Sequence, residues 1–242
     1  MRALIAALLL IPDAAGAVDC RDMAFDAASF TLCEVAAGED LRLFLKDGAG
    51  AALGSFAAIE DSLPSGKVLR FAMNAGMYHP DLSPVGLFVQ DGVERAGIVT
   101  ADGPGNFGLL PNGVFCILPG GAGFAVVESR RFVARGPACD SASQSGPMLV
   151  IGGELHPRFL AASNSTHRRN GVGVSANGQR AVFVISNSAV NFHRFARFFR
   201  DGLGLPDALY FDGSISRLYA PEIGRSDAGF AMGPMVGVVG DE

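Results

Sequence analysis

The chain has 242 residues, of which 49% are hydrophobic and 18% are charged, and its formal net charge is −5. This composition is typical of a compact globular protein and excludes a disordered one. The acidic balance, together with the absence of any block of Lys and Arg, argues against a nucleic-acid partner.

Residues 1–17 have the pattern of a secretory signal peptide. Arg2 precedes an apolar run over residues 3–11, and Ala15-Gly16-Ala17 forms a small-residue cleavage site. The apolar run is too short to cross a bilayer, and no later run is long enough, so we expect no stable membrane insertion. We therefore predict an exported protein, periplasmic or secreted. Residues 18–242 are long enough to form one domain with its own core.

The four cysteines are even in number, and export makes disulfides possible. Three pairings are open. We favour Cys20 with Cys33 and Cys116 with Cys139, because each of these pairs closes a short loop. No C-x-x-C or His-rich spacing is present, so no metal site is predicted.

Most of the chain consists of short strand patterns separated by turn signals such as Asp47-Gly48. The expected strands are residues 41–46, 68–73, 85–90, 93–100, 113–118, 123–127, 132–134, 171–174, 181–185, 208–211 and 235–239, with one more entered after a polar start within 144–151.

One helix is expected between Asn191 and Leu203, where apolar side chains recur at helical spacing. Asn191 or Ser188 caps its start, and Gly202 or Gly204 ends it. With the strands before and after it, this helix predicts a β-α-β unit that contains two parallel strands. The fold class is therefore α+β, a single domain with a large mixed β-sheet, few helices and a C-terminal β-α-β unit.

The stretch that follows residues 208–211 is the strongest candidate for a site. The strand ends at the lone carboxylate Asp212, followed by Gly213 and the hydroxyls of Ser214 and Ser216. A carboxylate at a strand end needs hydrogen bonds or a cation, so Asp212 either serves a ligand or only caps its own turn. If the two parallel strands are neighbours, Asn187 lies beside Asp212.

Uncharged hydrogen-bonding side chains gather at other strand ends. They suit a polyhydroxylated ligand, because they both donate and accept, and the cationic pair Arg168 and Arg169 suits a phosphate. A sugar phosphate satisfies both, although such residues are also ordinary in loops. Gly103 to Gly108 matches G-x-G-x-x-G, but no helix pattern follows, so no cofactor is expected. The uncharged candidates are Asn74, Asn106, Asn112, Gln144, Asn187, Ser214 and Ser216.

Five motifs, in order, resemble the phosphodiester glycosidase family. That family includes a lysosomal enzyme that removes N-acetylglucosamine from a mannose phosphodiester, and the similarity covers roughly residues 41–239. The usual Asp-Gly-Gly-x-Ser of the family is Asp-Gly-Ser-Ile-Ser here, and its Arg-Thr is Arg169-Asn170. The motifs are Asn-Ala-Gly-Met-Tyr (74–78), Gly-Asn-Phe (105–107) with Pro-Asn-Gly-Val-Phe (111–115), Gln-Ser-Gly-Pro-Met-Leu (144–149), Arg-Asn-Gly-Val-Gly (169–173) and Leu-Tyr-Phe-Asp-Gly-Ser-Ile-Ser (209–216).

The resemblance implies hydrolysis of a sugar-1-phosphodiester in envelope or extracellular glycans. Asp212 is then the nucleophile, general base or charge stabiliser, and Arg169 binds the phosphate. For a second carboxylate, the candidates Glu154, Asp102 and Asp140 are not ranked. The substrate-binding positions that the resemblance implies are Asn74, Tyr78, Asn106, Asn112, Gln144, Gly146, Asn187, Gly213, Ser214 and Ser216.

The alternative is a protein of the cell envelope that binds a glycan or sugar phosphate without cleaving it. The lack of an obvious acid/base pair favours this alternative. Turnover discriminates between the two hypotheses.

Overall fold

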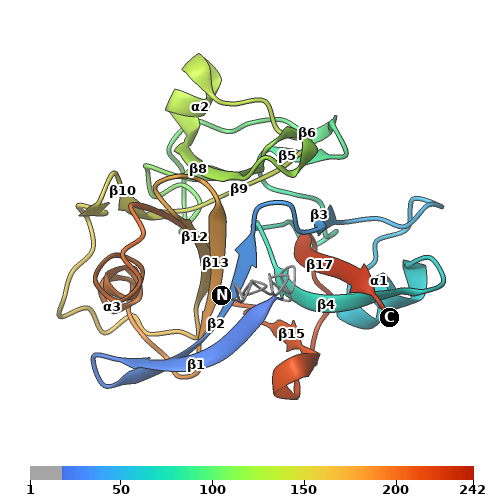
Figure 1. Ribbon diagram of the computed structural model, residues 1–242. Coiled ribbons are helices and arrows are strands. Elements are labelled where there is room, and N and C mark those ends of the chain that lie inside the picture. Colours follow the sequence, from blue (N-terminus) through green and yellow to red (C-terminus); the bar gives the residue numbers. More distant parts are fainter. Residues whose placement is uncertain (1–17) are drawn as a thin grey trace, which may run out of the picture.

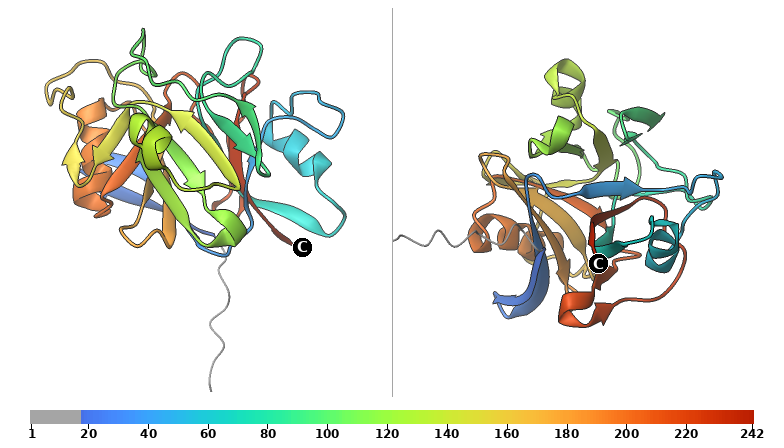
Figure 2. Two further views of the ribbon diagram at one scale, coloured as in Figure 1. Left: turned by 90° about the horizontal axis from the view of Figure 1, so that it is seen from above. Right: turned by 45° about the vertical axis from the view of Figure 1, so that its right-hand side comes forward.

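The computed structural model describes residues 18–242, and the predicted signal peptide lies outside the described residues. The strands form three sheets, which meet around a shared centre (Figures 1 and 2). The α+β class with few helices is confirmed. All strand pairs in the described chain are antiparallel, so the expected single mixed sheet is corrected to three antiparallel sheets.

The first sheet has seven strands, and the candidate acid Asp212 is the last residue of one of its inner strands, β14 (Asp207–Asp212). Its order is β1 (Asp19–Phe25), β2 (Ala28–Ala36), β13 (Arg180–Ser186), β12 (Asn170–Val174), β14, β10 (Met148–Ile151) and β11 (Glu154–Leu155).

The other two sheets have five strands each. One runs β16 (Arg225–Ser226), β15 (Leu218–Ala220), β4 (Lys67–Asn74), β17 (Met235–Asp241) and β3 (Leu41–Phe44). The other runs β6 (Val93–Ala96), β5 (Phe88–Gln90), β9 (Ser141–Ser145), β7 (Gly113–Ile117) and β8 (Phe124–Glu128).

The predicted β-α-β unit exists, but its two strands are not neighbours. Strand β12 lies between β13 and β14 and is antiparallel to both, so β13 and β14 run in the same direction one strand apart. Gly171 permits the close approach of β12 to β14, because a Cβ there would lie 2.4 Å from the carbonyl oxygen of Leu209. Periodicity along the chain cannot reveal such an inserted strand.

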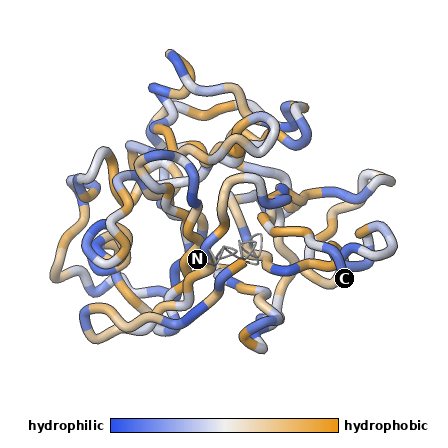
Figure 3. The backbone as a smooth tube through the Cα atoms, viewed as in Figure 1, coloured by the Kyte–Doolittle hydropathy of each residue, from blue (hydrophilic) through white to orange (hydrophobic). Residues whose placement is uncertain are grey.

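The main core lies where the inner faces of the three sheets meet. Phe71, Phe115, Phe183 and Phe211 come from different strands and pack ring against ring, with centroids 5.0 to 6.5 Å apart. Each such buried side chain stabilises the fold by about 1.5–3 kcal/mol. Figure 3 shows the hydrophobic stretches along the central strands and the hydrophilic ones concentrated at the outer turns.

A second core lies between the seven-stranded sheet and helix α3 (Phe192–Arg197), which covers the outer face of that sheet (Figure 1). Asn191 caps α3 as expected, with its Oδ1 accepting from the Arg194 N–H at 2.9 Å. A π-helical turn (Phe198–Gly202) continues the helix to the predicted glycine.

Two further helices were not predicted. Residues 132–134, expected as a strand, lie in α2 (Ser129–Arg135), which begins where the Glu128 carboxylate accepts from two backbone N–H groups, those of Arg130 and Arg131. Helix α1 (Phe56–Ser62) begins at the cap Ser55. Both helices are only seven residues long, and so give too little periodicity to detect. Short 3-10 turns span Pro119–Gly121 and Pro221–Ile223.

Both favoured disulfides are confirmed. Cys20 and Cys33 are register partners on β1 and β2, and Cys116 of β7 is bonded to Cys139. Within residues 18–242 no helix is long and apolar enough to span a bilayer.

Candidate active site

Two buried amides form the base of the candidate site. Asn74 ends β4 and Asn170 begins β12, and the Asn170 Nδ2 donates to both the carbonyl oxygen and the Oδ1 of Asn74, at 2.9 and 3.0 Å. The Asn170 Oδ1 accepts from the backbone N–H of Asp212 at 3.0 Å. The Asn74 Oδ1 accepts from the backbone N–H of Arg217 at 2.9 Å. The pair therefore fixes the main chain at both ends of the loop 212–217.

Asp212 lies at the end of β14 and is partly exposed. Its Oδ1 accepts from the backbone N–H groups of Gly213 and Ser214, at 2.6 and 2.9 Å. Burial raises the pKa of this carboxyl, and the backbone N–H groups of Ser214, Gly213 and Ile215 oppose that rise. Asp212 thus does cap its own turn, and the residue remains partly exposed.

Two phenols lie within the electrostatic field of Asp212. Burial raises the pKa of Tyr210, and Arg169 opposes the rise while the Asp212 charge adds to it. Burial and then the Asp212 charge also raise the pKa of Tyr78, whose hydroxyl donates to the carbonyl oxygen of Ala231 at 3.3 Å. Both phenols therefore stay protonated at neutral pH and remain hydrogen-bond donors.

The predicted loop residues surround this acid. The Ser216 Oγ donates to the carbonyl oxygen of Asp212 at 2.8 Å, and Ser214 is exposed. Gly213 touches the Tyr210 phenol so closely that a Cβ would lie 2.1 Å from its oxygen. Asn106 is exposed in its loop and lies beside the same phenol, where it lowers the pKa of Tyr210. These residues therefore form one group with Asn74 and Tyr78.

Arg169 is fully buried, in contrast to the predicted phosphate-binding role. Its guanidinium donates to the carbonyl oxygens of Val190 and Ser165, at 2.9 and 3.1 Å, and to the Tyr210 hydroxyl at 3.4 Å. It lies 3.6 Å from the centre of the Phe192 ring, and only 1% of its surface is exposed. Burial lowers the pKa of this guanidinium. In this structure Arg169 holds Tyr210 in place and does not reach solvent.

Gln144, Asn112 and Gly146 form a separate buried group. The Gln144 Oε1 accepts from the N–H groups of Leu87 and Val99, both at 3.0 Å, and its Nε2 lies 3.4 Å from the Asn112 Oδ1. Asn112 donates to the carbonyl oxygen of Phe107, and a Cβ on Gly146 would lie 2.6 Å from the Asn112 Cβ. The hydrogen bonds of these amides hold loops and are not shared with Asp212.

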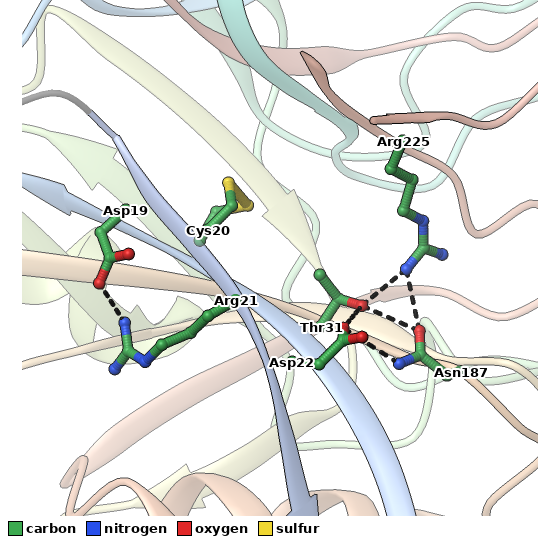
Figure 4. The surroundings of a disulfide bond; sticks show 8 residues. Asp19, Cys20, Arg21, Asp22, Thr31, Asn187 and Arg225 are labelled. Carbon is green, nitrogen blue, oxygen red and sulfur yellow. Dashed lines mark hydrogen bonds and ion pairs between the residues drawn. A yellow bond between two sulfur atoms is a disulfide. The ribbon is translucent and has the colours of Figure 1, made fainter. Parts of the chain in front are cut away.

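Asn187 lies in another place, because β12 separates its strand from β14. It belongs to a polar group with Asp22, Thr31 and Arg225 (Figure 4). These residues line a hollow of about 240 Å³. The Arg225 Nη1 donates to the Asn187 Oδ1 at 2.9 Å and to the Thr31 Oγ1 at 2.8 Å, and Thr31 donates to Asp22. The expectation that Asn187 and Asp212 lie side by side is therefore corrected.

None of the proposed second carboxylates forms a hydrogen bond with Asp212 among the described residues. Asp140 accepts from the Gly120 N–H at 2.8 Å, and Glu154 lies at the sheet edge within the field of Arg200. Asp102 precedes Asn106 in an exposed loop. The described chain also holds no group of three His, Cys, Asp or Glu side chains placed to bind a metal ion.

The sequence prediction missed three residues of the site: Asn170, Tyr210 and Arg217. Tyr210 stands two residues before Asp212 on the same strand, and side chains at that spacing share a face of the sheet. Asn170 is the register partner of Asp212, which only the strand pairing reveals. Arg217 carried no signal beyond its place directly after Ser216.

Comparison with known proteins identifies a family and related folds. Residues 67–231 match the phosphodiester glycosidase family. The Escherichia coli (strain K12) uncharacterized protein YigE is 33% identical over 181 residues, which are 75% of this chain and 70% of that protein.

Two solved structures share the fold. The catalytic domain of zebrafish N-acetylglucosamine-1-phosphodiester alpha-N-acetylglucosaminidase, auto-inhibited by its pro-peptide, aligns with a TM-score of 0.63 at 12% identity, over 92% of this chain and 82% of that chain. A protein of Burkholderia pseudomallei K96243 aligns with a TM-score of 0.55 at 12% identity, over 87% and 74%. From the family match and the relative together, the chain belongs to the phosphodiester glycosidase family.

Proposed function

We propose that this protein is an exported glycosidase that hydrolyses the bond between the anomeric carbon of a sugar and an oxygen of a phosphodiester. The observation that carries the proposal is the carboxylate of Asp212 at the end of β14. Asp212 is partly exposed, its carboxylate accepts from two backbone N–H groups, and its charge acts on two protonated phenols.

A single carboxylate suits a phosphate leaving group. Glycosidases commonly use one acid to protonate the departing oxygen and a second carboxylate at the anomeric carbon. A phosphodiester oxygen is weakly basic and departs with little proton donation, so the first acid is dispensable. Asp212 then acts at the anomeric carbon as nucleophile, as base for water, or as stabiliser of an oxocarbenium-like transition state.

Local hydrogen bonds keep this carboxylate ready for that role. Burial disfavours its charge, but Gly213 and Ser214 donate to one of its oxygens and favour the ionised form. The phenol of Tyr78, which is partly exposed, would donate to a sugar or phosphate oxygen, whereas Tyr210 is fully buried and supports the main chain at Gly213.

Two disulfides support a location outside the cytoplasm, where oxidising conditions preserve them. The predicted signal peptide supports the same location. The substrate would therefore be a sugar-1-phosphodiester of the envelope or of extracellular glycans.

A binding protein without activity is the second candidate. It is favoured by the turn-capping bonds of Asp212, and by the fact that none of the three candidate second carboxylates in residues 18–242 is hydrogen-bonded to Asp212. Such a protein would bind sugar phosphates, as measured by calorimetry, and would release no product.

The test uses purified mature protein and three methyl phosphodiesters, in which a methyl group esterifies the phosphate of glucose 1-phosphate, galactose 1-phosphate or N-acetylglucosamine 1-phosphate. Each is tested in both anomeric forms. Wild-type protein is expected to release free sugar from at least one of them. Asp212→Asn keeps the shape of the side chain and should reduce the rate by at least about 100-fold. Undiminished hydrolysis by this variant would sink the assignment of Asp212, and a folded wild-type protein that cleaves none of the substrates would favour the binding protein.

A further inference from the structure

Arg217 shares the rigid base of the candidate site with Asp212. Its backbone N–H donates to Asn74, which is bonded to Asn170, and Asn170 accepts from the backbone N–H of Asp212. The next residue, Leu218, pairs with Met73 of β4. The main chain of Arg217 is therefore held in a fixed relation to the main chain of the acid.

The guanidinium of Arg217 has no partner within residues 18–242. It forms no hydrogen bond and no ion pair there, whereas Arg169 binds two carbonyl oxygens and Arg225 binds Asp227. Only 8% of Arg217 is exposed, and its Nη2 packs so closely on Gly229 that a Cβ there would lie 2.5 Å away. A largely desolvated cation without a partner is costly, so this arrangement favours an anion.

The guanidinium keeps an open side. The described chain contains no fully buried side-chain nitrogen or oxygen that lacks a hydrogen bond. Because Arg217 forms none, its nitrogens must retain contact with solvent. Of the titratable groups around it, Tyr78 and Asp227 exert the charge effects. Asp227 is occupied by Arg225 and by the Leu218 N–H, and the phenol of Tyr78 lies within the electrostatic field of both Arg217 and Asp212.

We propose that Arg217 binds the phosphate of the substrate, which is the role that the sequence predicted for Arg169. This inference rests on the proposed function, and it names the group that selects a phosphodiester over a neutral glycoside. A guanidinium presents a planar fork that matches two phosphate oxygens.

The loop that covers Arg217 also carries an aromatic ring. Phe230 is 83% exposed and stands between Gly229, which touches the guanidinium, and Ala231, which accepts from Tyr78. An exposed aromatic face beside polar groups suits the apolar face of a sugar ring. Phe230 therefore offers an exposed aromatic ring on the loop that packs on Arg217.

The experiment compares Arg217→Met, Arg217→Lys and the control Arg95→Met, which removes the same charge from an exposed position on β6. Thermal melting checks that each variant is folded. The kcat/KM is measured on a methyl-capped sugar 1-phosphate and on the neutral nitrophenyl glycoside of the same sugar. Binding of the free sugar 1-phosphate is measured by calorimetry in an Asp212→Asn background.

Arg217→Met should lower kcat/KM on the phosphodiester and affinity for the sugar 1-phosphate by about 100-fold, while neutral-glycoside turnover changes by less than about threefold. Arg217→Lys should recover part of the loss, and Arg95→Met should show none. Equal losses on both substrates for Arg217→Met, or unchanged sugar 1-phosphate affinity, would overturn the role of Arg217. If the wild type hydrolyses nothing, the proposed activity fails, and the calorimetric arm still decides this inference.

Discussion

The molecule contains two groups of buried amides that look alike in sequence and differ in what they hold. The Asn74–Asn170 pair accepts from the backbone N–H groups of Asp212 and Arg217. The group around Gln144 accepts from the N–H groups of Leu87 and Val99 and donates to Ser129. The Asn74–Asn170 pair fixes the loop that carries Asp212 and Arg217. The Gln144 group fixes loops around the five-stranded sheet that contains β9.

The difference shows that a buried amide is not in itself a ligand-binding residue. Amide side chains at strand ends satisfy main-chain groups first, because an unpaired buried N–H costs about 1–3 kcal/mol. The chemistry then depends on which loop the amide holds. In this protein the loop held by Asn74 and Asn170 carries Asp212 and Arg217, and Asp212 is partly exposed.

Of the variants that separate the two groups, Asn170→Ala has the largest expected effect on activity. It removes the acceptor of the Asp212 N–H and leaves Asn74 without its donor. We expect a loss of about 1–3 kcal/mol in the free energy of unfolding and a fall of about 100-fold in kcat/KM, because the acid is misplaced. Urea unfolding and initial rates on a sugar-1-phosphodiester check both values. Full activity in folded Asn170→Ala would remove the amide pair from the site.

Gly213→Ala and Gly86→Ala form a matched pair of variants. The first adds a methyl group beside Tyr210 near Asp212, and the second adds one beside Gln144. Neither glycine has a positive φ, and the added Cβ would lie 2.1 Å from the Tyr210 hydroxyl oxygen at 213 and 2.3 Å from the Gln144 Oε1 at 86. Both variants should lose about 1–3 kcal/mol of stability. Only Gly213→Ala should lower kcat, by about tenfold, since only it displaces a phenol beside Asp212. Equal kcat losses in the two variants would contradict the separation of the groups.

Gln144→Ala should affect stability and spare the chemistry. It removes both the acceptor of Leu87 and Val99 and the donor to Ser129, which predicts a loss of about 3 kcal/mol. The activity per folded molecule should stay within about threefold of wild type at a temperature well below the melting point. A large rise in KM without loss of stability would instead make Gln144 a substrate ligand.

The smallest effect is a pH dependence of stability. Burial raises the pKa of Asp212 in the folded protein above its unfolded value, so protonation favours folding. The contribution is fully present below the unfolded pKa and is lost as pH rises through the folded pKa. As pH rises through that acidic window, the wild type should therefore lose stability relative to Asp212→Asn. At neutral pH, Asp212→Asn should have a melting temperature no lower than that of the wild type. A constant difference across the window would show that Asp212 titrates normally.

The sequence predicted those parts of the fold that have a local signal. The helix after Asn191 followed from its apolar spacing and its cap, and the strand before Asp212 from a short apolar run. The position of β12 between β13 and β14 depends on pairing between distant segments, which no local pattern contains. Strand β2 is buried along most of its length, so it shows no alternation to detect.

The candidate site was predicted in part for the same reason. Asp212 stood out as one carboxylate between an apolar run and a glycine. Arg169 was assigned to phosphate from its charge and from family likeness, yet its burial under Phe192 could not be predicted without the fold. Arg217 looked ordinary in sequence, and it is distinguished by having no partner for its guanidinium within residues 18–242.

The most direct measurement of the central claim is hydrolysis of a sugar-1-phosphodiester in oxygen-18-labelled water, with mass spectrometry of both products. Attack at the anomeric carbon, assisted by Asp212, should place the label in the released sugar and leave the phosphate unlabelled. Label in the phosphate would mean that the phosphorus–oxygen bond is cut, and this would contradict a glycosidase built on Asp212.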